Sequence, residues 1–176
     1  MSMRHIKGPN SSSTLSNVLP SDIQPNAVDL RIGKVFEINK EVFILDEDKK
    51  QHRGSTELLP DERGYWNLYK GSYEVIMENM IEVGDNEAGW VITRSTLNRN
   101  GVHLTSGLYD TGYDGVMAGV MHVTIGKMIV KPGTRIGQYL CFEAESLSTY
   151  SGDYGRGKKH DTIKYKTVDL EQFHRV

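Results

Sequence analysis

The stretch Gly107-Leu-Tyr-Asp-Thr-Gly-Tyr-Asp-Gly115 lies between two short apolar runs, Val102 to Leu104 and Val116 to Val123. Its three glycines permit backbone turns that a side chain would block. Between them lie one carboxylate, Asp110, and one aromatic ring, Tyr113. A carboxylate in a tight connection between strands is well placed to contact a ligand, although an Asp that caps a β-turn shows the same pattern. Spacing alone therefore leaves both interpretations open.

Composition and charge are those of an ordinary soluble globular protein with one core. The chain has 176 residues, of which 25% are charged and 38% hydrophobic, and this length is short for two independent domains. Because 21 basic and 23 acidic residues nearly balance, nucleic acid is not the expected partner. No run approaches the roughly 18 apolar residues of a membrane span, and a signal-peptide core is absent, so we expect a cytoplasmic protein with no membrane partner.

Cysteine and histidine give no sign of a metal centre. The single cysteine, Cys141, lies in an apolar run, where a buried and inert thiol is expected. One cysteine excludes an internal disulfide and a cysteine-rich zinc site. His103 and His122 lie on predicted strands and are interpreted as structural residues.

The pattern predicts an all-β fold. Short alternating or apolar segments recur at the spacing of a β-sandwich or barrel, punctuated by glycine and proline. We expect a mobile polar arm over residues 1–14, a barrel domain over 15–149 and a cationic, aromatic-bearing arm over 150–176. The expected strands are 27–32 (ended by Gly33), 42–45, 66–69, 73–77, 80–83, 90–92, 102–104, 116–123, 128–130, 136–142 and 162–168. Short helical segments are predicted at 15–19 and within 93–99.

Four stretches in a fixed order carry a family resemblance. They are Ala27-Val-Asp-Leu-Arg-Ile-Gly33, Arg94-Ser-Thr-Leu-Asn-Arg99, the Gly107–Gly115 stretch and Pro132-Gly-Thr-Arg-Ile-Gly-Gln138. Together they resemble the dUTPase and dCTP deaminase superfamily of trimeric β-barrel nucleotide enzymes, over roughly residues 15 to 160. The resemblance implies a dUTPase-like barrel or jelly roll of short strands with one short helix, a flexible C-terminal arm that closes over the site, and a homotrimer.

The resemblance also implies where a pyrimidine deoxynucleoside would bind. The segment containing Leu104, Ser106 and Gly107 would receive the base largely through main-chain groups. Asp110 would be catalytic and would deprotonate the water that attacks a phosphorus atom. Tyr113 would lie under the deoxyribose and leave no room for a 2′-hydroxyl.

Other residues are implied to contact the triphosphate. Those on the barrel are Arg94, Ser95, Arg99 and Gln138, and those on the C-terminal arm are Arg156, Lys158 and Lys159. Asp29 would lie near the Mg²⁺ ion and act on it only indirectly, through water and phosphates. The arm lacks the Gly-Gly-Phe-Gly of typical dUTPases, so Tyr150, Tyr154 or His160 would supply the plane that stacks on the base.

The two branches of the superfamily differ at one position. The deaminase has a catalytic glutamate where this chain has Val120, and the run 116–123 contains no acid. Ser95-Thr-Leu-Asn-Arg99 nevertheless resembles the deaminase branch. We favour a diphosphatase that converts dUTP, or a related pyrimidine deoxynucleotide, to the monophosphate and pyrophosphate. A deaminase, a bifunctional deaminase and diphosphatase, and a non-catalytic nucleotide- or protein-binding member are the alternatives.

Overall fold

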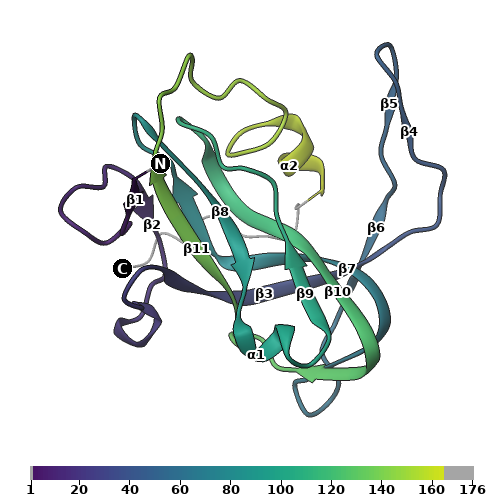
Figure 1. Cartoon of the computed structure of the whole chain (residues 1–176). Helices are drawn as coiled ribbons and strands as arrows, with labels where there is room; N and C mark the ends of the chain where they lie inside the picture. The colour runs from purple at the N-terminus through teal and green to yellow at the C-terminus, as the bar shows by residue number, and fades with distance from the viewer. Residues whose placement is uncertain (1, 165–176) are drawn as a thin grey trace.

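The computed structural model describes residues 2–164, which fold almost wholly into antiparallel strands (Figure 1). The all-β prediction is confirmed. The strands are β1 (Met3–Arg4), β2 (Thr14–Leu15), β3 (Val28–Ile38), β4 (Ile44–Leu45), β5 (Lys50–Gln51), β6 (Ser55–Leu58), β7 (Trp66–Glu82), β8 (Glu87–Thr93), β9 (Val102–Thr105), β10 (Asp114–Val130) and β11 (Arg135–Glu143). The helices are the 3₁₀ turn η1 (Pro20–Asp22), α1 (Ser95–Asn98) and α2 (Lys159–Lys164).

Nine of these strands form one curled sheet. Its main path runs β1-β11-β3-β7-β10-β9, with β2 paired to β7, β6 to β3 and β8 to β11. The strands β4 and β5 form a separate two-stranded hairpin. In Figure 1 this hairpin projects beyond the sheet, and α1 and α2 lie at opposite ends of the molecule.

Strand β3 turns the corner of the sheet at Gly33. Residues 28–31 pair with β11, whereas the strand from Ile32 onward pairs with β7 and β6. A Cβ at Gly33 would lie 3.2 Å from the Glu78 side chain, so glycine permits this close approach. The prediction that Gly33 ends the strand is wrong, because the register shift between Ile32 and Lys34 absorbs the irregularity without breaking the strand.

Two strands are longer than predicted. The segments expected as three strands between 66 and 83 form the single strand β7, and those expected at 116–123 and 128–130 form β10. Glycine was interpreted as a strand break, yet Gly71 lies within β7 opposite Val123. The partner strand continues past such a glycine and keeps its backbone paired. Local sequence cannot indicate whether a partner strand is present.

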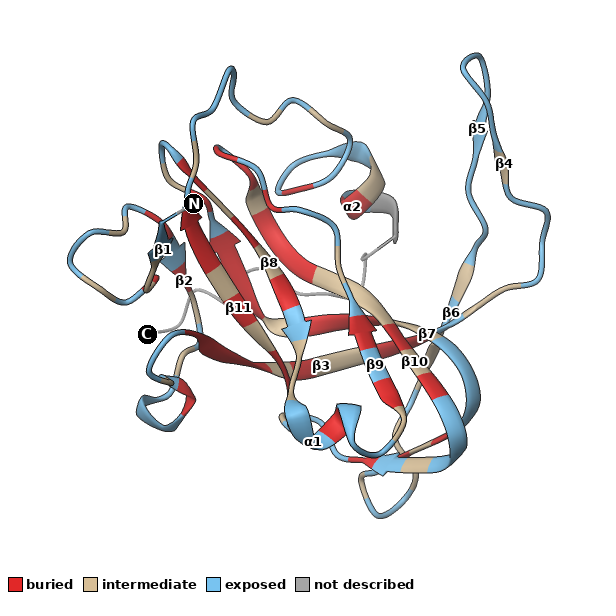
Figure 2. Ribbon diagram, viewed as in Figure 1, coloured by how far each residue is buried: buried red, intermediate tan, exposed pale blue. Residues whose placement is uncertain are grey.

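The core lies inside the curl of the sheet, where Figure 2 shows buried residues along β3, β10 and β11. A second, smaller apolar cluster occupies the other face and contains Phe36, Ile76, Met80 and Val116. Cys141 is buried and free, as predicted. Burial raises the pKa of its thiol to about 11, which keeps the thiol protonated and unreactive at neutral pH.

Both ends of the described chain differ from expectation. Residues 15–19, predicted as a short helix, contain the end of β2 and are followed by η1. Residues 162–164 belong to α2, so the strand predicted at 162–168 is wrong there, and 165–168 lie outside the described residues. No helix in the described part of the chain is both long and apolar enough to cross a membrane.

Residues 2–14, predicted as a mobile arm, lie against the barrel. Strand β1 pairs with the end of β11, and Ser11, Ser12 and Ser13 surround the buried carboxylate of Glu87. Ser11 Oγ donates to Glu87 at 2.9 Å and the Ser13 backbone N–H at 3.0 Å, while the Ser13 hydroxyl also donates. Arg4 adds an ion pair at 3.0 Å.

These contacts set the charge state of Glu87. Burial by itself would raise the pKa, but hydrogen bonds from Ser13, Arg4, Ser11 and the Ser12 N–H outweigh it and lower the pKa of Glu87 to about 2. A fully buried carboxylate with this many donors is ionised at neutral pH and holds the N-terminal segment in place.

We expect Glu87→Gln to lower the free energy of unfolding at pH 7 by about 3 kcal/mol, because it removes one partner of a buried ion pair. The exposed Glu145→Gln serves as the matched control. In the wild type, this stabilisation is complete above pH 4.5 and is lost as the pH falls toward about 2. Urea unfolding at several pH values measures both effects, and equal stability of the two variants at pH 7 would contradict the assigned role.

Candidate functional site

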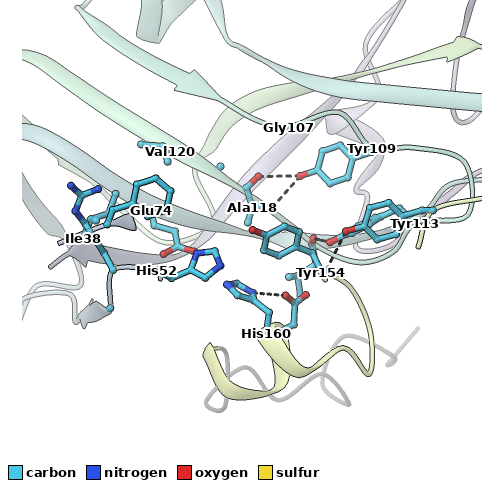
Figure 3. Close-up of a pocket in the computed structure, with 17 residues that line it drawn as sticks. Ile38, His52, Glu74, Gly107, Tyr109, Tyr113, Ala118, Val120, Tyr154 and His160 are labelled. Carbon is cyan, nitrogen blue, oxygen red and sulfur yellow. Dashed lines mark hydrogen bonds and ion pairs between the residues drawn. The ribbon is translucent and has the colours of Figure 1, made fainter. Parts of the chain in front are cut away.

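A cavity of about 550 Å³ opens on the face of the sheet that carries the second apolar cluster (Figure 3). Its volume falls in the range of small-molecule sites. Strands β7 and β10 supply the floor, the 106–113 loop supplies one wall, and the β4–β5 hairpin and the C-terminal segment cover the opening. The lining residues are Ile38, Phe43, His52, Arg53, Gly54, Glu74, Gly107, Tyr109, Tyr113, Val116, Ala118, Gly119, Val120, Tyr150, Tyr154, His160 and Asp161.

The floor follows from strand alternation. Val116, Ala118 and Val120 point from β10 into the cavity, whereas Met117 and Met121 are buried in the main core. On the neighbouring strand β7, Glu74 lies directly opposite Val120. The floor is therefore apolar except for one half-buried carboxylate.

Two tyrosines fix the wall of the cavity. The Tyr113 hydroxyl donates to the Val116 carbonyl at 2.8 Å, and the Tyr109 hydroxyl donates to the Ala118 carbonyl at 3.1 Å. Their rings meet edge to face with centroids 5.3 Å apart. Burial raises the pKa of both phenols, so each stays protonated and acts as a donor. These two hydrogen bonds attach the loop that carries Asp110 to strand β10.

The C-terminal segment covers the cavity. The Tyr150 N–H donates to the Thr111 carbonyl at 2.8 Å, and the Arg156 N–H donates to the Asp114 carbonyl at 2.6 Å. These bonds attach the segment to the Gly107–Gly115 stretch. Tyr150 and Tyr154 then line the cavity together with His160 of α2.

The hairpin formed by β4 and β5 contacts the C-terminal segment that covers the cavity. Lys50 pairs with Asp153 at 2.9 Å and lies 5.6 Å from the centre of the Tyr154 ring. The His52 and His160 rings lie 5.4 Å apart. The sequence predicts a strand at 42–45 and, from its charged residues, a turn or loop from Asp46 to Gly54, but it gives no sign of this contact. Only Ile44–Leu45 of the predicted strand is extended and paired.

Gly107, Tyr113 and Tyr154 meet at the cavity as predicted site residues, and Tyr150 and His160, the other two candidates for the stacking plane, also line it. Asp110 is exposed on the adjoining loop, where its carbonyl accepts from the Tyr113 N–H at 3.0 Å. Ser106 fixes the start of the loop by donating to the Gly107 carbonyl at 2.9 Å. Asp110 thus directly follows Tyr109 of the cavity wall but is not itself part of the lining.

The remaining residues predicted near the cavity divide between core and surface. Leu104 is buried in the main core. Lys158 is exposed and precedes α2, while the Arg156 guanidinium lies 3.1 Å from the Asp114 carboxylate. Lys159, the first residue of α2, is also exposed, so all three cations predicted to meet the phosphates lie at the surface.

A second group of predicted residues gathers around Asp29. This carboxylate is fully buried and accepts from Gln138 at 3.0 Å and Arg135 at 3.2 Å, with an Arg94 guanidinium nitrogen at 3.4 Å. Gln24 donates at 3.3 Å. Asp29 thus orients Arg94, Arg135 and Gln138 at one end of the sheet.

Helix α1 continues this second group. Arg94 lies at its N-cap position, Ser95 is its first residue, and Arg99 follows its last residue. Ser95 and Arg99 are exposed. Because α1 and α2 lie at opposite ends of the molecule (Figure 1), one copy of the chain does not bring the α1 group to the cavity cover.

A directly bound metal ion does not fit the residues present. Both carboxylate oxygens of Asp29 already accept hydrogen bonds from side chains. Among residues 2–164, no group of three or more His, Cys, Asp or Glu side chains is arranged to hold a metal ion.

Sequence reasoning missed Glu74 and His52 as cavity residues. Glu74 lies in a segment correctly expected to be a strand, but its position opposite Val120 depends on the register between β7 and β10. His52 lies in a charged stretch that was interpreted as a loop. The segment 68–75, which contains Glu74, resembles the deaminase branch, but that resemblance assigned Glu74 no role. His52 belongs to no recognised motif.

Comparison with known proteins identifies similar chains. The sequence model of a family described as dCTP deaminase-like matches residues 4–144. The deoxyuridine 5′-triphosphate nucleotidohydrolase of Methanocaldococcus jannaschii is 30% identical over 153 residues, which cover 85% of this chain and 97% of that protein. A dUMP-forming dCTP deaminase of Salinispora arenicola is 28% identical over 137 residues, which cover 74% of this chain and 71% of that one.

One solved structure supports the fold. The 2′-deoxycytidine 5′-triphosphate deaminase from Agrobacterium tumefaciens superposes with a TM-score of 0.58 at 16% identity, over 88% of this chain. This chain spans 48% of the length of that deaminase. The shared feature is the fold of the barrel.

We expect Lys50→Ala to loosen the cover of the cavity, because it removes both the Asp153 pair and the contact with Tyr154. Because an exposed ion pair is weakened by solvent, amide hydrogen exchange of residues 150–162 should accelerate only by about two- to fivefold. The neighbouring exposed Lys49→Ala is the control and should leave exchange unchanged. Equal exchange in both variants would show that the hairpin does not hold the C-terminal segment.

Proposed function

Because the chain belongs to the dUTPase and dCTP deaminase superfamily, we propose that it is a nucleotide diphosphatase acting on dUTP or a related pyrimidine deoxynucleoside triphosphate. The products would be the monophosphate and pyrophosphate. The observation that carries the proposal is the cavity lined by Gly107, Tyr109 and Tyr113, in a chain that matches a protein named as a dUTP nucleotidohydrolase over 97% of its length.

The cavity suits a pyrimidine nucleoside. Its apolar floor and aromatic wall match the flat faces of a base, and the exposed backbone of Gly107 offers main-chain groups to the base edge. Tyr113 is fixed by its bond to Val116, so its ring is a rigid surface for the sugar. A rigid ring there would exclude a ribose 2′-hydroxyl by contact.

Asp110 is the proposed general base. It lies on the loop that leads into the cavity wall, and its exposed carboxylate can take a proton from a water molecule placed beside the phosphates. Displacement at phosphorus depends mainly on positioning and on stabilising negative charge. Arg94, Ser95, Arg99 and Gln138 supply donors for that charge.

These donors lie away from the cavity in one chain, so we infer that the complete site forms between copies. A homotrimer would bring the α1 group of one copy to the cavity of another. The cations Arg156 and Lys158 would then meet the phosphates from the covering segment. Mg²⁺ would enter with the triphosphate, and Asp29 would act only by holding Arg94 and Gln138 in place.

We expect Asp110→Asn to lower kcat for dUTP hydrolysis by about 100-fold or more while KM changes little, because the substitution removes the base and keeps the shape. Pyrophosphate release measures the rate, and the exposed Asp48→Asn is the control. If the wild type hydrolyses dUTP and Asp110→Asn is as fast, another group is the base. If the wild type turns over no nucleotide, the barrel is a binding module.

A mixing experiment tests the shared site. Ser95→Ala and Asp110→Asn should each be nearly inactive as purified proteins. If the two groups of residues come from different copies, unfolding and refolding an equal mixture should restore part of the activity, because some sites then contain both intact residues. A mixture refolded from Asp110→Asn and Tyr113→Ala, whose altered residues lie on the same loop, provides the control and should recover none. An inactive first mixture would contradict a site built between copies.

A further inference from the structure

We propose that the cavity contains a subsite for a polar substituent on carbon 5 of the pyrimidine, so that the chain acts on a 5-hydroxymethyl pyrimidine deoxynucleotide at least as well as on an unsubstituted one. The inference deepens the proposed function and rests on it in one respect, namely that the sugar lies on Tyr113 and the base edge meets the backbone of Gly107. It concerns the part of the cavity that this placement of the nucleoside does not fill.

The cavity extends beyond the length of a pyrimidine ring. The Tyr113 hydroxyl donates to the Val116 carbonyl at 2.8 Å, which places the surface for the sugar at the Val116 end of β10. Glu74 lies opposite Val120, four residues further along that strand. Four residues of extended strand span about 13 Å, slightly less across the bulge that follows Val116. A pyrimidine ring covers less than half of this length, so the floor beside Val120 continues past the base.

Figure 3 shows the two ends of the cavity, with Tyr113 at one end, Ala118 between, and Glu74 at the other end. The volume of about 550 Å³ falls in the range of sites for drug-sized molecules, which are larger than a nucleoside. We call the end that is distant from Tyr113 the far end of the cavity. Its lining residues are Ile38, Phe43, His52, Arg53 and Glu74.

The hairpin segment 39–54 holds three of these residues in place. The Asn39 N–H donates to the Gly54 carbonyl at 3.0 Å, and the Gly54 N–H donates to the Glu41 carboxylate at 3.0 Å, which closes the base of the segment. Near its tip, Lys50 pairs with Asp153 of the cover at 2.9 Å. The far end is therefore enclosed by a segment that is attached at both its base and its tip.

The placement of the nucleoside decides which ring atom points to the far end. The sugar is attached to N1, and the edge that carries O2, N3 and the 4-substituent would face the main chain at Gly107. The two carbons that remain are C5 and C6, and C6 lies next to the sugar. Carbon 5 is thus directed away from both Tyr113 and Gly107, toward Glu74.

The side chains of the far end suit a hydroxyl group on a one-carbon arm. A carboxylate has several lone-pair sites, so Glu74 can accept from a ligand hydroxyl in addition to its contacts within the protein. Arg53 offers donors, and its guanidinium is held by a bond from Nε to the Glu41 carbonyl at 3.0 Å and by the Phe43 ring, whose centre is 5.6 Å away. Because a hydroxyl both donates and accepts, one group matches Glu74 and Arg53 together.

Other substituents match the far end less well. A methyl group offers neither function, so it would remove water from Glu74 and Arg53 without replacing the hydrogen bonds. An ammonium group would be repelled by Arg53, and a carboxylate by Glu74. The chemistry of the lining therefore selects a neutral group that donates and accepts, carried on a short apolar arm.

A comparison of three nucleotides tests the subsite. Purified protein is incubated with Mg²⁺ and with dUTP, 5-hydroxymethyl-dUTP or dTTP, and pyrophosphate release gives kcat/KM for each. Because dTTP carries a methyl group on carbon 5, it measures the effect of size without the hydroxyl. We expect 5-hydroxymethyl-dUTP to be hydrolysed at least as efficiently as dUTP and about tenfold more efficiently than dTTP, since a hydrogen bond to a charged group contributes about that factor.

Variants of Glu74 assign the effect to the far end. Glu74→Ala should lower the ratio of kcat/KM for 5-hydroxymethyl-dUTP to that for dUTP by about tenfold. Glu74→Gln keeps the shape and a neutral acceptor, so the ratio should fall less. Glu82→Ala, at an exposed position on the same strand, is the matched control and should leave the ratio unchanged. Since the ratio is taken within one preparation, partial loss of folded protein cancels. An unchanged ratio in Glu74→Ala would overturn the assignment.

Binding measurements separate this inference from the proposed function, because titration calorimetry with dUMP and 5-hydroxymethyl-dUMP needs no turnover. If dUTP is hydrolysed but 5-hydroxymethyl-dUTP reacts no faster than dTTP, the subsite fails and the diphosphatase stands. If no nucleotide is hydrolysed but 5-hydroxymethyl-dUMP binds more tightly than dUMP, and Glu74→Ala abolishes the difference, the subsite stands and the diphosphatase fails. If no nucleotide is hydrolysed and 5-hydroxymethyl-dUMP binds no more tightly than dUMP, both proposals fail.

Discussion

Strands β7 and β10, of 17 residues each, pair antiparallel from Asp114 opposite Glu82 to Val130 opposite Trp66. This ribbon separates the main core on one face from the cavity on the other. Because side chains alternate along a strand, one residue of slip would exchange Val120 and Met121 between the two faces. The bulge between Val116 and Ala118 and the register shift before Lys127 fix the pairing. The floor of the site, the orientation of the tyrosine wall and the position of Glu74 all follow from that register.

Local sequence was sufficient to predict the type of fold and the positions of most strands. The alternation from Val28 to Ile32 and the apolar run from Ile136 to Phe142 mark strands that the structure contains. Local sequence could not predict where strands continue. Gly33 and Gly71 resemble breaks, yet partner strands carry the hydrogen bonds past them. Whether a glycine ends a strand or only allows a close approach depends on a neighbour that is distant in the sequence.

The candidate site was only partly predictable for the same reason. Motifs located Gly107, Tyr113 and the group around Arg94, because each lies in a contiguous pattern of residue types. Nothing in the sequence indicates that Ser11 to Ser13 surround Glu87 or that Lys50 meets Asp153. These contacts join segments more than 70 residues apart, and they depend on how the sheet curls. The environment of Asp29 is an intermediate case, since its motif was recognised but its pairing with two arginines and two amides was not.

Side chains at opposite positions on two paired strands reach the same region of space, although the two positions are far apart along the chain. Val120 and Glu74 are such a pair. A substitution at either position therefore alters the same part of the cavity floor. Because β7 and β10 are paired along almost their whole length, the composition of that floor depends on both strands together, and a change on one strand alters what the side chains of the other strand face.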